Sequence, residues 1–371
     1  MNIGVPLETF SGEARVSVTP ETVKKYLAQG HVVKVQSGAG VRASITDEAY
    51  QAAGAQITDA QEAMSQDMVL KVRAPSEQEL TWMKPGAILV GMLNPFDAQG
   101  LERLAAAQIT SFALEAAPRT TRAQSMDVLS SQANIAGYKA VMIAADKYQR
   151  FLPMLMTAAG TVKAARVLIL GVGVAGLQAI ATAKRLGAVI ECSDVRPSVK
   201  EQVESLGAKF IDVPYETDEE RQAAQGVGGY AKPMPAAWLE RQRMEVAKRL
   251  ALADIVITTA LIPGRPAPVL VSPEMVKSMK AGSVIVDLAA AQGGNCPLTQ
   301  ANQTVQVHGV TIVGETNLPA MVAADASALY ARNVLDFLKL ICPEGAQFKL
   351  NPEDDIVAAC LMTQDGTLKR K

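Results

Sequence analysis

A glycine-rich stretch holds the residue types and spacing with the clearest chemical meaning in this sequence. Gly171, Gly173 and Gly176 form a G-x-G-x-x-G pattern directly after the apolar run 167–170. In such a pattern the first glycine permits a tight turn, the second lets the backbone approach a pyrophosphate, and the third allows close helix–strand packing. Helical periodicity begins at Val174, so the free N–H groups of a helix N-terminus would face the phosphates. The stretch therefore predicts a dinucleotide-binding turn.

An acidic residue follows at the distance that a ribose contact requires. Asp194 ends a second apolar run, about 20 residues beyond the glycines. A carboxylate at this place accepts hydrogen bonds from a ribose 2′-hydroxyl and repels a 2′-phosphate. Arg196 points the other way, because a cation beside the acid would favour a phosphate. On balance we predict NAD(H) as the bound nucleotide, with Asp194 as the residue that selects it.

The composition excludes several classes of protein. The 371 residues are 49% hydrophobic and 20% charged, with a net charge of −1, which is enough for two domains and a large core. Nothing in the charge pattern indicates nucleic-acid binding. The four cysteines are far apart and form no C-x-x-C pair, which is typical of a reduced cytosolic protein. No signal peptide and no membrane-spanning run are recognisable, so we expect a soluble, cytoplasmic chain.

Strand-like and helix-like segments alternate along the whole sequence, which predicts an α/β fold with parallel sheets. We expect two Rossmann-like parallel-sheet domains with a cleft between them, joined by long helices at about 135–150 and 328–340. The first domain would contain residues 1–134 and 319–371, and the nucleotide-binding domain residues 135–318. The latter would hold six strands, which begin near Val167, Ala188, Phe210, Ile255, Val284 and Val310.

Groups that could serve as a general acid or base are scarce. The two histidines, His31 and His308, lie at strand ends and are better explained as structural residues. No metal-ligand cluster and no Ser–His–Asp set can be assembled. A dehydrogenase acting on an alcohol or amine moves a proton with its hydride and needs such a group. Hydride exchange between two nicotinamides needs none, because the protein only has to position and desolvate the two rings.

The polar segment 118–132 has side chains suited to positioning a nicotinamide. A carboxamide offers two N–H donors and one acceptor. The segment supplies donors, an acceptor and a hydroxyl that can act as either, at Arg119, Gln124, Asp127 and Ser130. The alternative is a polar loop that leads into a helix with Ser130 or Ser131 as its N-cap. The sequence alone leaves both interpretations open.

Two further segments have the character of functional loops. Residues 215–235 combine glycines and prolines with little apolar periodicity, and Tyr230 among the glycines favours a flap that closes over bound nucleotide. A disordered linker is the alternative. Residues 258–264 follow the fourth strand of the nucleotide-binding domain, at the sheet edge where dinucleotides bind. They would be either a cofactor contact or a simple turn.

Several motifs together resemble the NAD(H)-binding domain, or alpha-1 subunit, of proton-translocating nicotinamide nucleotide transhydrogenase. The resemblance covers essentially the whole chain and is carried by residues 122–138, 171–187, 229–232, 258–264 and 293–297. It implies a homodimer of two-domain subunits that bind NAD(H) in the interdomain cleft. It also implies partners: a membrane-spanning proton-channel subunit and a separate NADP(H)-binding component. The chain would then lie peripherally on the inner face of the cell membrane.

The resemblance also implies roles for individual residues. The nicotinamide end would be contacted by the polar set Arg119, Gln124, Asp127 and Ser130, which with Tyr230 would be the catalytic residues. The other cofactor contacts would be Gly171, Val172, Gly173, Val174 and Gly176 at the pyrophosphate, Asp194, Val195 and Arg196 at the ribose, and Gly229, Tyr230, Gln242, Ala260 and Leu261 on the loops. The stretch before Tyr230 is a few residues longer than the family pattern.

Alanine dehydrogenase is the nearest related family and the main alternative. Arg15 and Lys71 match its substrate-carboxylate contacts. Its catalytic histidine is replaced by Asn94, and its aspartate before Gln-Gly-Gly is replaced by Ala291. An amino-acid dehydrogenase without both proton-handling residues would be a poor catalyst. A non-catalytic NAD-binding sensor would also lack them, and the motif at 122–138 argues against that third interpretation.

Overall fold

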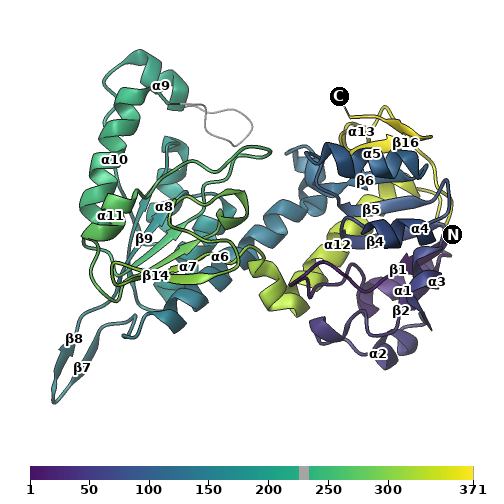
Figure 1. The fold of residues 1–371 in the computed structure, drawn as a ribbon, viewed down its shortest axis with the longest axis horizontal. Coiled ribbons are helices and arrows are strands. Elements are labelled where there is room, and N and C mark those ends of the chain that lie inside the picture. Colours follow the sequence, from purple (N-terminus) through teal and green to yellow (C-terminus); the bar gives the residue numbers. More distant parts are fainter. Residues whose placement is uncertain (225–233, 371) are drawn as a thin grey trace. The chain divides into compact units, whose positions relative to one another are not determined.

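The structure is a computed structural model that describes residues 1–224 and 234–370. It divides into two compact units, which we call unit 1 (residues 1–132 and 319–371) and unit 2 (residues 133–318). Each unit has its own sheet and its own apolar core. Helices and mainly parallel strands alternate in both (Figure 1). The predicted α/β class with two Rossmann-like sheets is confirmed.

Unit 1 is built on an eight-stranded sheet in the order β17-β16-β6-β5-β4-β1-β2-β3. Its strands are β1 (Asn2–Val5), β2 (Val32–Gln36), β3 (Gln56–Thr58), β4 (Met68–Arg73), β5 (Ile88–Met92), β6 (Thr110–Ala113), β16 (Leu361–Gln364) and β17 (Thr367–Leu368). Its helices are α1 (Pro20–Ala28), α2 (Asp47–Ala52), α3 (Ala60–Met64), α4 (Glu77–Trp82), α5 (Ala98–Ala106), α12 (Ala323–Ile341) and α13 (Asp355–Cys360), with 3₁₀ turns η1 (Val41–Ala43), η2 (Leu114–Ala116) and η3 (Thr121–Met126).

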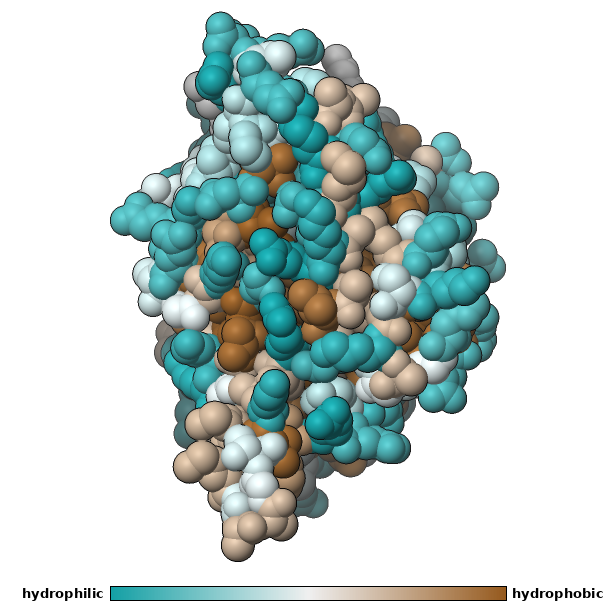
Figure 2. All heavy atoms as spheres, turned by 90° about the vertical axis from the view of Figure 1, so that its left-hand side faces the viewer, coloured by the Kyte–Doolittle hydropathy of each residue, from teal (hydrophilic) through white to brown (hydrophobic). Residues whose placement is uncertain are grey.

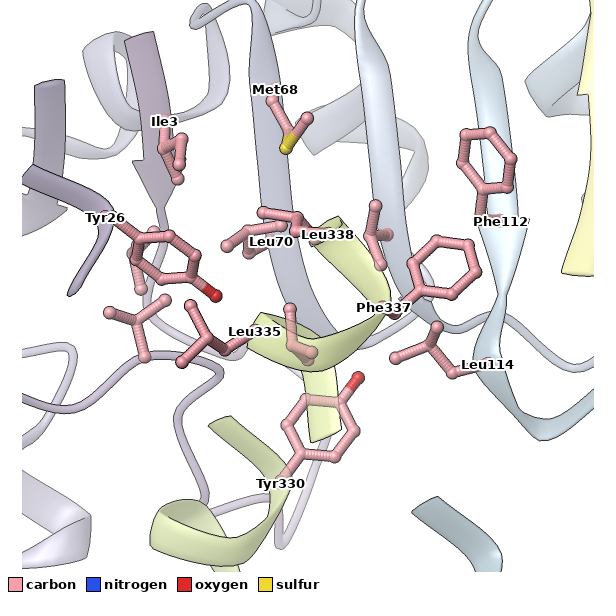
Figure 3. Packing of buried hydrophobic residues seen from close by; sticks show 14 of the residues in the cluster. Ile3, Tyr26, Met68, Leu70, Phe112, Leu114, Tyr330, Leu335, Phe337 and Leu338 are labelled. Atoms are coloured by element: carbon pink, nitrogen blue, oxygen red, sulfur yellow. The ribbon is translucent and has the colours of Figure 1, made fainter. Parts of the chain in front are cut away.

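The core of unit 1 lies between this sheet and α12, which returns to it from the far end of the sequence. Figure 3 shows Phe337 of α12 beside Phe112 of β6, with their ring centroids 5.4 Å apart. Tyr330, also on α12, donates its hydroxyl to the carbonyl of Lys71 at 2.8 Å. The middle strands are buried on both faces, as expected for parallel strands covered by helices on both sides.

Unit 2 is built on a seven-stranded sheet in the order β11-β10-β9-β12-β13-β15-β14. Its strands are β9 (Arg166–Leu170), β10 (Val189–Ser193), β11 (Lys209–Phe210), β12 (Ile255–Thr258), β13 (Val284–Asp287), β14 (Thr304–Val307) and β15 (Val310–Val313), with a separate hairpin of β7 (Leu155–Thr157) and β8 (Gly160–Val162). Its helices are α7 (Val174–Arg185), α8 (Lys200–Ser205), α9 (Asp218–Ala224), α10 (Ala236–Leu250) and α11 (Pro273–Ser278), with 3₁₀ turns η4 (Pro197–Val199) and η5 (Ala290–Gln292). Helix α6 (Val128–Lys147) and the 3₁₀ turn η6 (Leu318–Val322) contain the boundaries between the units.

The strand order of unit 2 creates one topological switch point. The chain proceeds outward from β9 through β10 to β11, and then returns to place β12 on the other side of β9. In such sheets dinucleotides bind outside the carboxyl ends of the strands at this reversal. Antiparallel β14 is one strand more than the six predicted, because the turn at His308 folds it back on β15.

Two predicted boundaries were wrong. The helix expected at 135–150 begins at Val128, because the Asp127 carboxylate accepts a hydrogen bond from the Ser130 amide at 2.9 Å and caps it. Asp127, rather than Ser130 or Ser131, is therefore the N-cap. The loop expected at 215–235 contains helix α9, which has acidic residues in its first turn, and the Thr217 hydroxyl accepts from the Glu220 amide.

Candidate functional site

The glycine turn has a backbone that other residues could not adopt without strain. Gly171 follows β9 directly and has a φ of +92°, in the region that favours glycine. A Cβ on Gly176 would lie 2.2 Å from the carbonyl oxygen of Gly171, so only glycine lets α7 approach the turn. A Cβ on Gly173 would meet no atom within 4 Å. The open position is the one at which a pyrophosphate is expected to approach.

Helix α7 begins at this open glycine. Gly173 is its N-cap and supplies no side-chain hydrogen bond to the first turn. The N–H groups of a 12-residue helix therefore face the turn without a side-chain cap, and the helix dipole adds partial positive charge there. A Cβ on Gly137 of α6 would lie 2.1 Å from the Ala175 carbonyl oxygen, so α6 packs directly on this first turn. The turn fits a diphosphate in shape and in charge.

Asp194 lies just beyond β10 and its carboxylate is fully engaged. Oδ2 accepts from the Val172 amide at 2.7 Å, which ties the acid to the glycine turn. The remaining partners come from Arg196, whose amide and Nε donate to Oδ1 at 2.9 Å and whose Nη2 donates to Oδ2 at 2.8 Å. These contacts use the four acceptor positions of a carboxylate. A ribose hydroxyl must therefore share or replace a donor of Arg196.

Side chains from α10 and from the loop after β12 reach the same sheet edge. Gln242 of α10 donates to the hydroxyl of Ser193, the residue before Asp194, at 3.1 Å. Thr259 donates to the Gly171 carbonyl at 2.8 Å and holds the first residue of the turn. Leu261, predicted as a cofactor contact, is 41% exposed.

Asn295 holds the loop that carries Ala260. The side chain of Asn295 is buried and its amide forms three hydrogen bonds: it accepts from the Ala260 amide at 3.1 Å, and it donates to the carbonyls of Ala260 and Pro268 at 2.9 and 2.8 Å. Asp287, at the end of β13, orders the adjoining segment by accepting from the Thr299 hydroxyl and the Cys296 amide. Both residues act on the shape of the loops at the sheet edge.

In unit 1 the polar segment is anchored from both ends of the sequence. Ala123 and Met126 of η3 are buried. Arg122 pairs with Asp354 at the N-terminus of α13, with N–O distances of 2.6 and 2.9 Å. Asn333 of α12 donates to the Ser125 carbonyl at 2.7 Å. These anchors leave Gln124 and Arg119 exposed on a held backbone.

Asp127 and Ser130 are brought into direct contact. The Ser130 hydroxyl donates to Asp127 Oδ2 at 2.6 Å, while the Ser130 amide donates to Oδ1 at 2.9 Å. Because its proton is directed at the carboxylate, the Ser130 oxygen faces any further partner as an acceptor. The pair therefore presents acceptors to a ligand, whereas the exposed side chains of Arg119 and Gln124 can donate.

The position at which alanine dehydrogenase has its histidine is exposed and is held by a carboxylate. Asn94 has a φ of +56°, and Glu115 accepts from the amides of Leu93 and Asn94 at 3.2 and 2.7 Å. Burial raises the pKa of Glu115 to about 6, although both amides oppose the shift. Ala291, at the other replaced position, lies exposed in η5. Neither Asn94 nor Ala291 can exchange a proton near neutral pH.

A buried charge cluster occupies the region of Arg15 and Lys71. Nε and Nη2 of Arg15 donate to Glu13 at 2.7 and 2.6 Å. Nζ of Lys71 lies 2.9 Å from Glu79 and 3.4 Å from Glu8. Burial acts to raise the pKa of Glu13, but the hydrogen bonds and charge of Arg15 outweigh it and hold that pKa at about 2. Both cations are thus already paired with carboxylates of unit 1.

The remaining predicted residues fall outside these groups. Gly229 and Tyr230, with most of the predicted flap, lie outside the described residues. His31 is buried edge-on against Tyr26, and His308 is exposed in the turn between β14 and β15. Sequence reasoning missed Thr259 and Asn295, although Asn295 lies within a motif that carried the family resemblance. It missed Gly137 as well, since a single glycine in a helix has no local signal.

Two family models match the chain and together cover most of it. The N-terminal domain model of alanine dehydrogenase/PNT matches residues 4–136, and the C-terminal domain model of the same family matches residues 140–371. The chain is 51% identical to an NAD(P) transhydrogenase subunit alpha protein of Rhodospirillum rubrum, over 99% of this chain and 97% of that one. It is 44% identical to NAD(P) transhydrogenase subunit alpha of Cereibacter sphaeroides, over 99% of this chain but 71% of that longer one.

Alanine dehydrogenases are similar to a lesser degree. The enzyme of Methanococcus maripaludis is 31% identical, over 93% of this chain and 88% of that one. Among solved structures, transhydrogenase from Sinorhizobium meliloti has a TM-score of 0.86 and 45% identity, with 99% of this chain and 98% of that one covered. An L-alanine dehydrogenase structure has a TM-score of 0.83 and 29% identity, with 99% and 96% covered. The fold is common to both relatives, and the sequence is nearer to the transhydrogenases.

Proposed function

Since this chain belongs to the alanine dehydrogenase/PNT family, we propose that it is the NAD(H)-binding component of a proton-translocating NAD(P) transhydrogenase. In this reaction a hydride passes from NADH to NADP⁺ held on a separate component, and the transfer is coupled to proton movement through a membrane partner. The observation that carries the proposal is a complete dinucleotide turn in a chain with Asn94 and Ala291 at the two proton-handling positions of the sister family.

The residues of unit 2 divide the nucleotide among them. The Gly171–Val174 turn and the N-terminus of α7 would bind the pyrophosphate, and Asp194 with Val195 and Arg196 the adenosine ribose. Gln242 and the Ala260–Leu261 loop would complete this end. Gly229 and Tyr230 would contribute from the segment outside the described residues, where we propose a loop that closes over bound nucleotide.

The isolated chain is expected to bind NADH at least about tenfold more tightly than NADPH. The Asp194 carboxylate would lie against a 2′-phosphate, and two like charges in a partly desolvated site repel. Titration of each nucleotide by its fluorescence gives both dissociation constants. The Asp194→Asn variant keeps the side-chain shape and removes the charge, so it should narrow the preference. Equal affinities of the unaltered chain for NADH and NADPH would contradict the assignment.

Hydride transfer itself asks the chain for positioning only. The hydride leaves C4 of one nicotinamide and joins C4 of the other, so no oxygen or nitrogen gains or loses a proton. Arg119 and Gln124 would donate to or orient the carboxamide, and the Asp127–Ser130 pair would accept from its N–H groups. These residues, with Tyr230, are the ones that we propose touch the reacting ring.

Gln124→Asn is expected to slow transfer about 10²-fold and to leave the NADH dissociation constant within about twofold. The shorter side chain would misplace the ring, while the pyrophosphate and ribose contacts of unit 2 stay intact. Stopped-flow transfer rates and NADH titration separate the two effects. Gln51→Asn, an exposed residue of α2, is the matched control and should change neither. A transfer rate that Gln124→Asn leaves unaltered would remove Gln124 from the catalytic set.

Partners follow from the proposed reaction. An NADP(H)-binding component and a membrane-spanning proton-channel subunit would complete the assembly, with this chain on the cytoplasmic side of the membrane as a peripheral component. Similarity to proteins named as subunits supports partners in general. No helix in the described part of the chain has both the length and the apolar character needed to cross a bilayer.

We also propose that the chain is a homodimer and that the hairpin β7–β8 contributes to its interface. The hairpin projects from unit 2 (Figure 1) and carries exposed Met154, Leu155 and Met156. Figure 2 shows it at the lower end of the view, mostly in tan, white and brown. A two-stranded ribbon is marginally stable alone, and an apolar one gains stability when a second chain covers it.

Met156→Glu is expected to shift the protein from dimer to monomer at micromolar concentration, because it would bury a charge in the interface. Met156 is 72% exposed in one chain, so the change should not affect folding of the monomer. Sedimentation velocity measures the distribution of the two species. Leu252→Glu alters another exposed apolar residue of unit 2 and should leave the dimer intact. If both variants sediment as the unaltered chain does, the hairpin is not an interface.

A further inference from the structure

The segment that follows β11 leaves the sheet beside the ribose-binding residues. Strands β10 and β11 are parallel neighbours, with Cys192 opposite Phe210, so their carboxyl ends lie at the same edge. Beyond β10 the chain continues to Asp194 and Val195, and beyond β11 it continues to Tyr215. In a dinucleotide site the adenine lies past the ribose on this outer side of the switch point. The residues after β11 are therefore positioned to meet it.

An aromatic pair occupies this place. The rings of Tyr215 and Trp238 are stacked, with their centroids 5.8 Å apart and an angle of 8° between their planes. Trp238, on α10, is 2% exposed, whereas Tyr215 is only partly buried. Both belong to a small apolar cluster of which Val195 is also a member. The cluster thus joins the aromatic pair to the residue next to Asp194.

Ion pairs hold Tyr215 in position. Nη2 of Arg241, on α10, donates to the Pro214 carbonyl at 3.4 Å and to the buried Glu220 at 2.7 and 2.8 Å, while Nη1 lies 3.0 Å from Glu216. The backbone on both sides of Tyr215 is therefore bound to α10. Gln242, the next residue of that helix, binds Ser193 at the end of β10. The same helix thus aligns the tyrosine with the ribose site.

We propose that Tyr215, backed by Trp238, is the wall of the nucleotide site against which the adenine ring packs. The inference rests on the NAD(H) binding proposed above and extends it by a residue that the glycine fingerprint does not predict. An aromatic ring with a rigid backing offers a flat face to adenine at little entropic cost, and base–aromatic stacking is sequence-tolerant and substantial. Burial, then Asp212 and Asp194, raise the pKa of Tyr215, so its phenol stays protonated.

The test compares ligands that contain adenine with one that does not. Tyr215→Leu keeps an apolar side chain and removes the flat ring, and it is expected to weaken binding of 5′-AMP and of NADH by about tenfold each. Reduced nicotinamide mononucleotide, which lacks adenosine, should bind that variant and the unaltered chain within about twofold. Tyr215→Phe keeps the ring and should retain both affinities. Leu239→Ala, an exposed neighbour of Trp238 on α10, is the control and should change none of them.

A second readout does not depend on a variant of Tyr215. In the Trp82→Phe background the fluorescence comes from Trp238 alone, since the sequence has two tryptophans. Addition of 5′-AMP, which does not absorb at the emission wavelength, should change that fluorescence with the dissociation constant found by calorimetry. Circular dichroism melting checks that each variant folds.

The outcomes separate this inference from the proposed function. If the unaltered chain binds neither NADH nor 5′-AMP, the proposed function fails. If it binds both, and Tyr215→Leu binds both with unaltered affinity while Trp238 fluorescence stays constant, the nucleotide site stands and the aromatic wall is wrong. An equal loss for reduced nicotinamide mononucleotide would show a general structural defect and would also overturn the assignment.

Discussion

The purified chain is expected to oxidise no small metabolite, and to transfer hydride only when a separate NADP(H)-binding protein is supplied. The sequence contains one dinucleotide fingerprint, at Gly171–Gly176, whereas transhydrogenation requires two nucleotide sites. Asn94 and Ala291 leave no proton relay for an alcohol or amine substrate. The expected change on adding the partner is from no detectable rate to steady formation of NADPH, measured by chromatography of the nucleotides.

The opposing assay uses the chain alone. NAD⁺ with alanine or lactate, and NADH with pyruvate and ammonia, should give no turnover above that of a heat-denatured sample. Turnover of alanine would restore the alanine dehydrogenase interpretation, with Arg15 and Lys71 released from Glu13 and Glu79 to bind the substrate carboxylate. Absence of turnover both there and with the NADP(H)-binding protein, from a chain that still binds NADH, would favour an NAD-binding sensor.

Alanine substitutions at two glycines of the same turn should have opposite effects. Gly173 has an ordinary φ of −80° and open space around its Cβ position, so Gly173→Ala should leave the melting temperature unaltered. The added methyl would fill the space of the pyrophosphate and weaken NADH binding by at least about tenfold. Gly176→Ala would place a methyl 2.2 Å from the Gly171 carbonyl oxygen and should destabilise the fold by about 1–3 kcal/mol.

Denaturant unfolding and NADH titration of the pair form the measurement. The higher helix propensity of alanine, worth about 1 kcal/mol, acts against the clash in Gly176→Ala and reduces its net effect. Gly282→Ala, in a turn with open space, serves as a strain control because its φ of +85° costs stability without any contact to nucleotide. If Gly173→Ala binds NADH as well as the unaltered chain, the pyrophosphate does not approach at Gly173.

Local patterns were sufficient where one segment specifies its own conformation. The run 167–170, three glycines at their spacing and a helical period after Val174 determine a strand, a turn and a helix, and the structure has all three. The alternation of such segments determined the α/β class and the parallel sheets. The extended loop expected at 215–235 failed because the acidic first turn of α9 was overlooked.

Long-range contacts decided the rest. The polar segment 118–132 is held by Arg122 on Asp354, 232 residues away, and by Asn333 on the Ser125 carbonyl, 208 residues away. Asn295 shapes the loop at Ala260 across 35 residues. None of these pairs has a spacing or period that marks it in the sequence, because the partners meet only after separate strands have paired.

The sequence by itself determined the nucleotide turn, the acid that follows it, the fold class and the absence of a proton relay, since each is a property of residue type and short spacing. Only the tertiary structure decided that Arg196 occupies Asp194, that Ser130 directs its proton at Asp127, and that Tyr215 stacks on Trp238 beside Val195. Hydrogen-bond direction and ring stacking depend on side-chain placement in three dimensions, which the folded backbone alone sets.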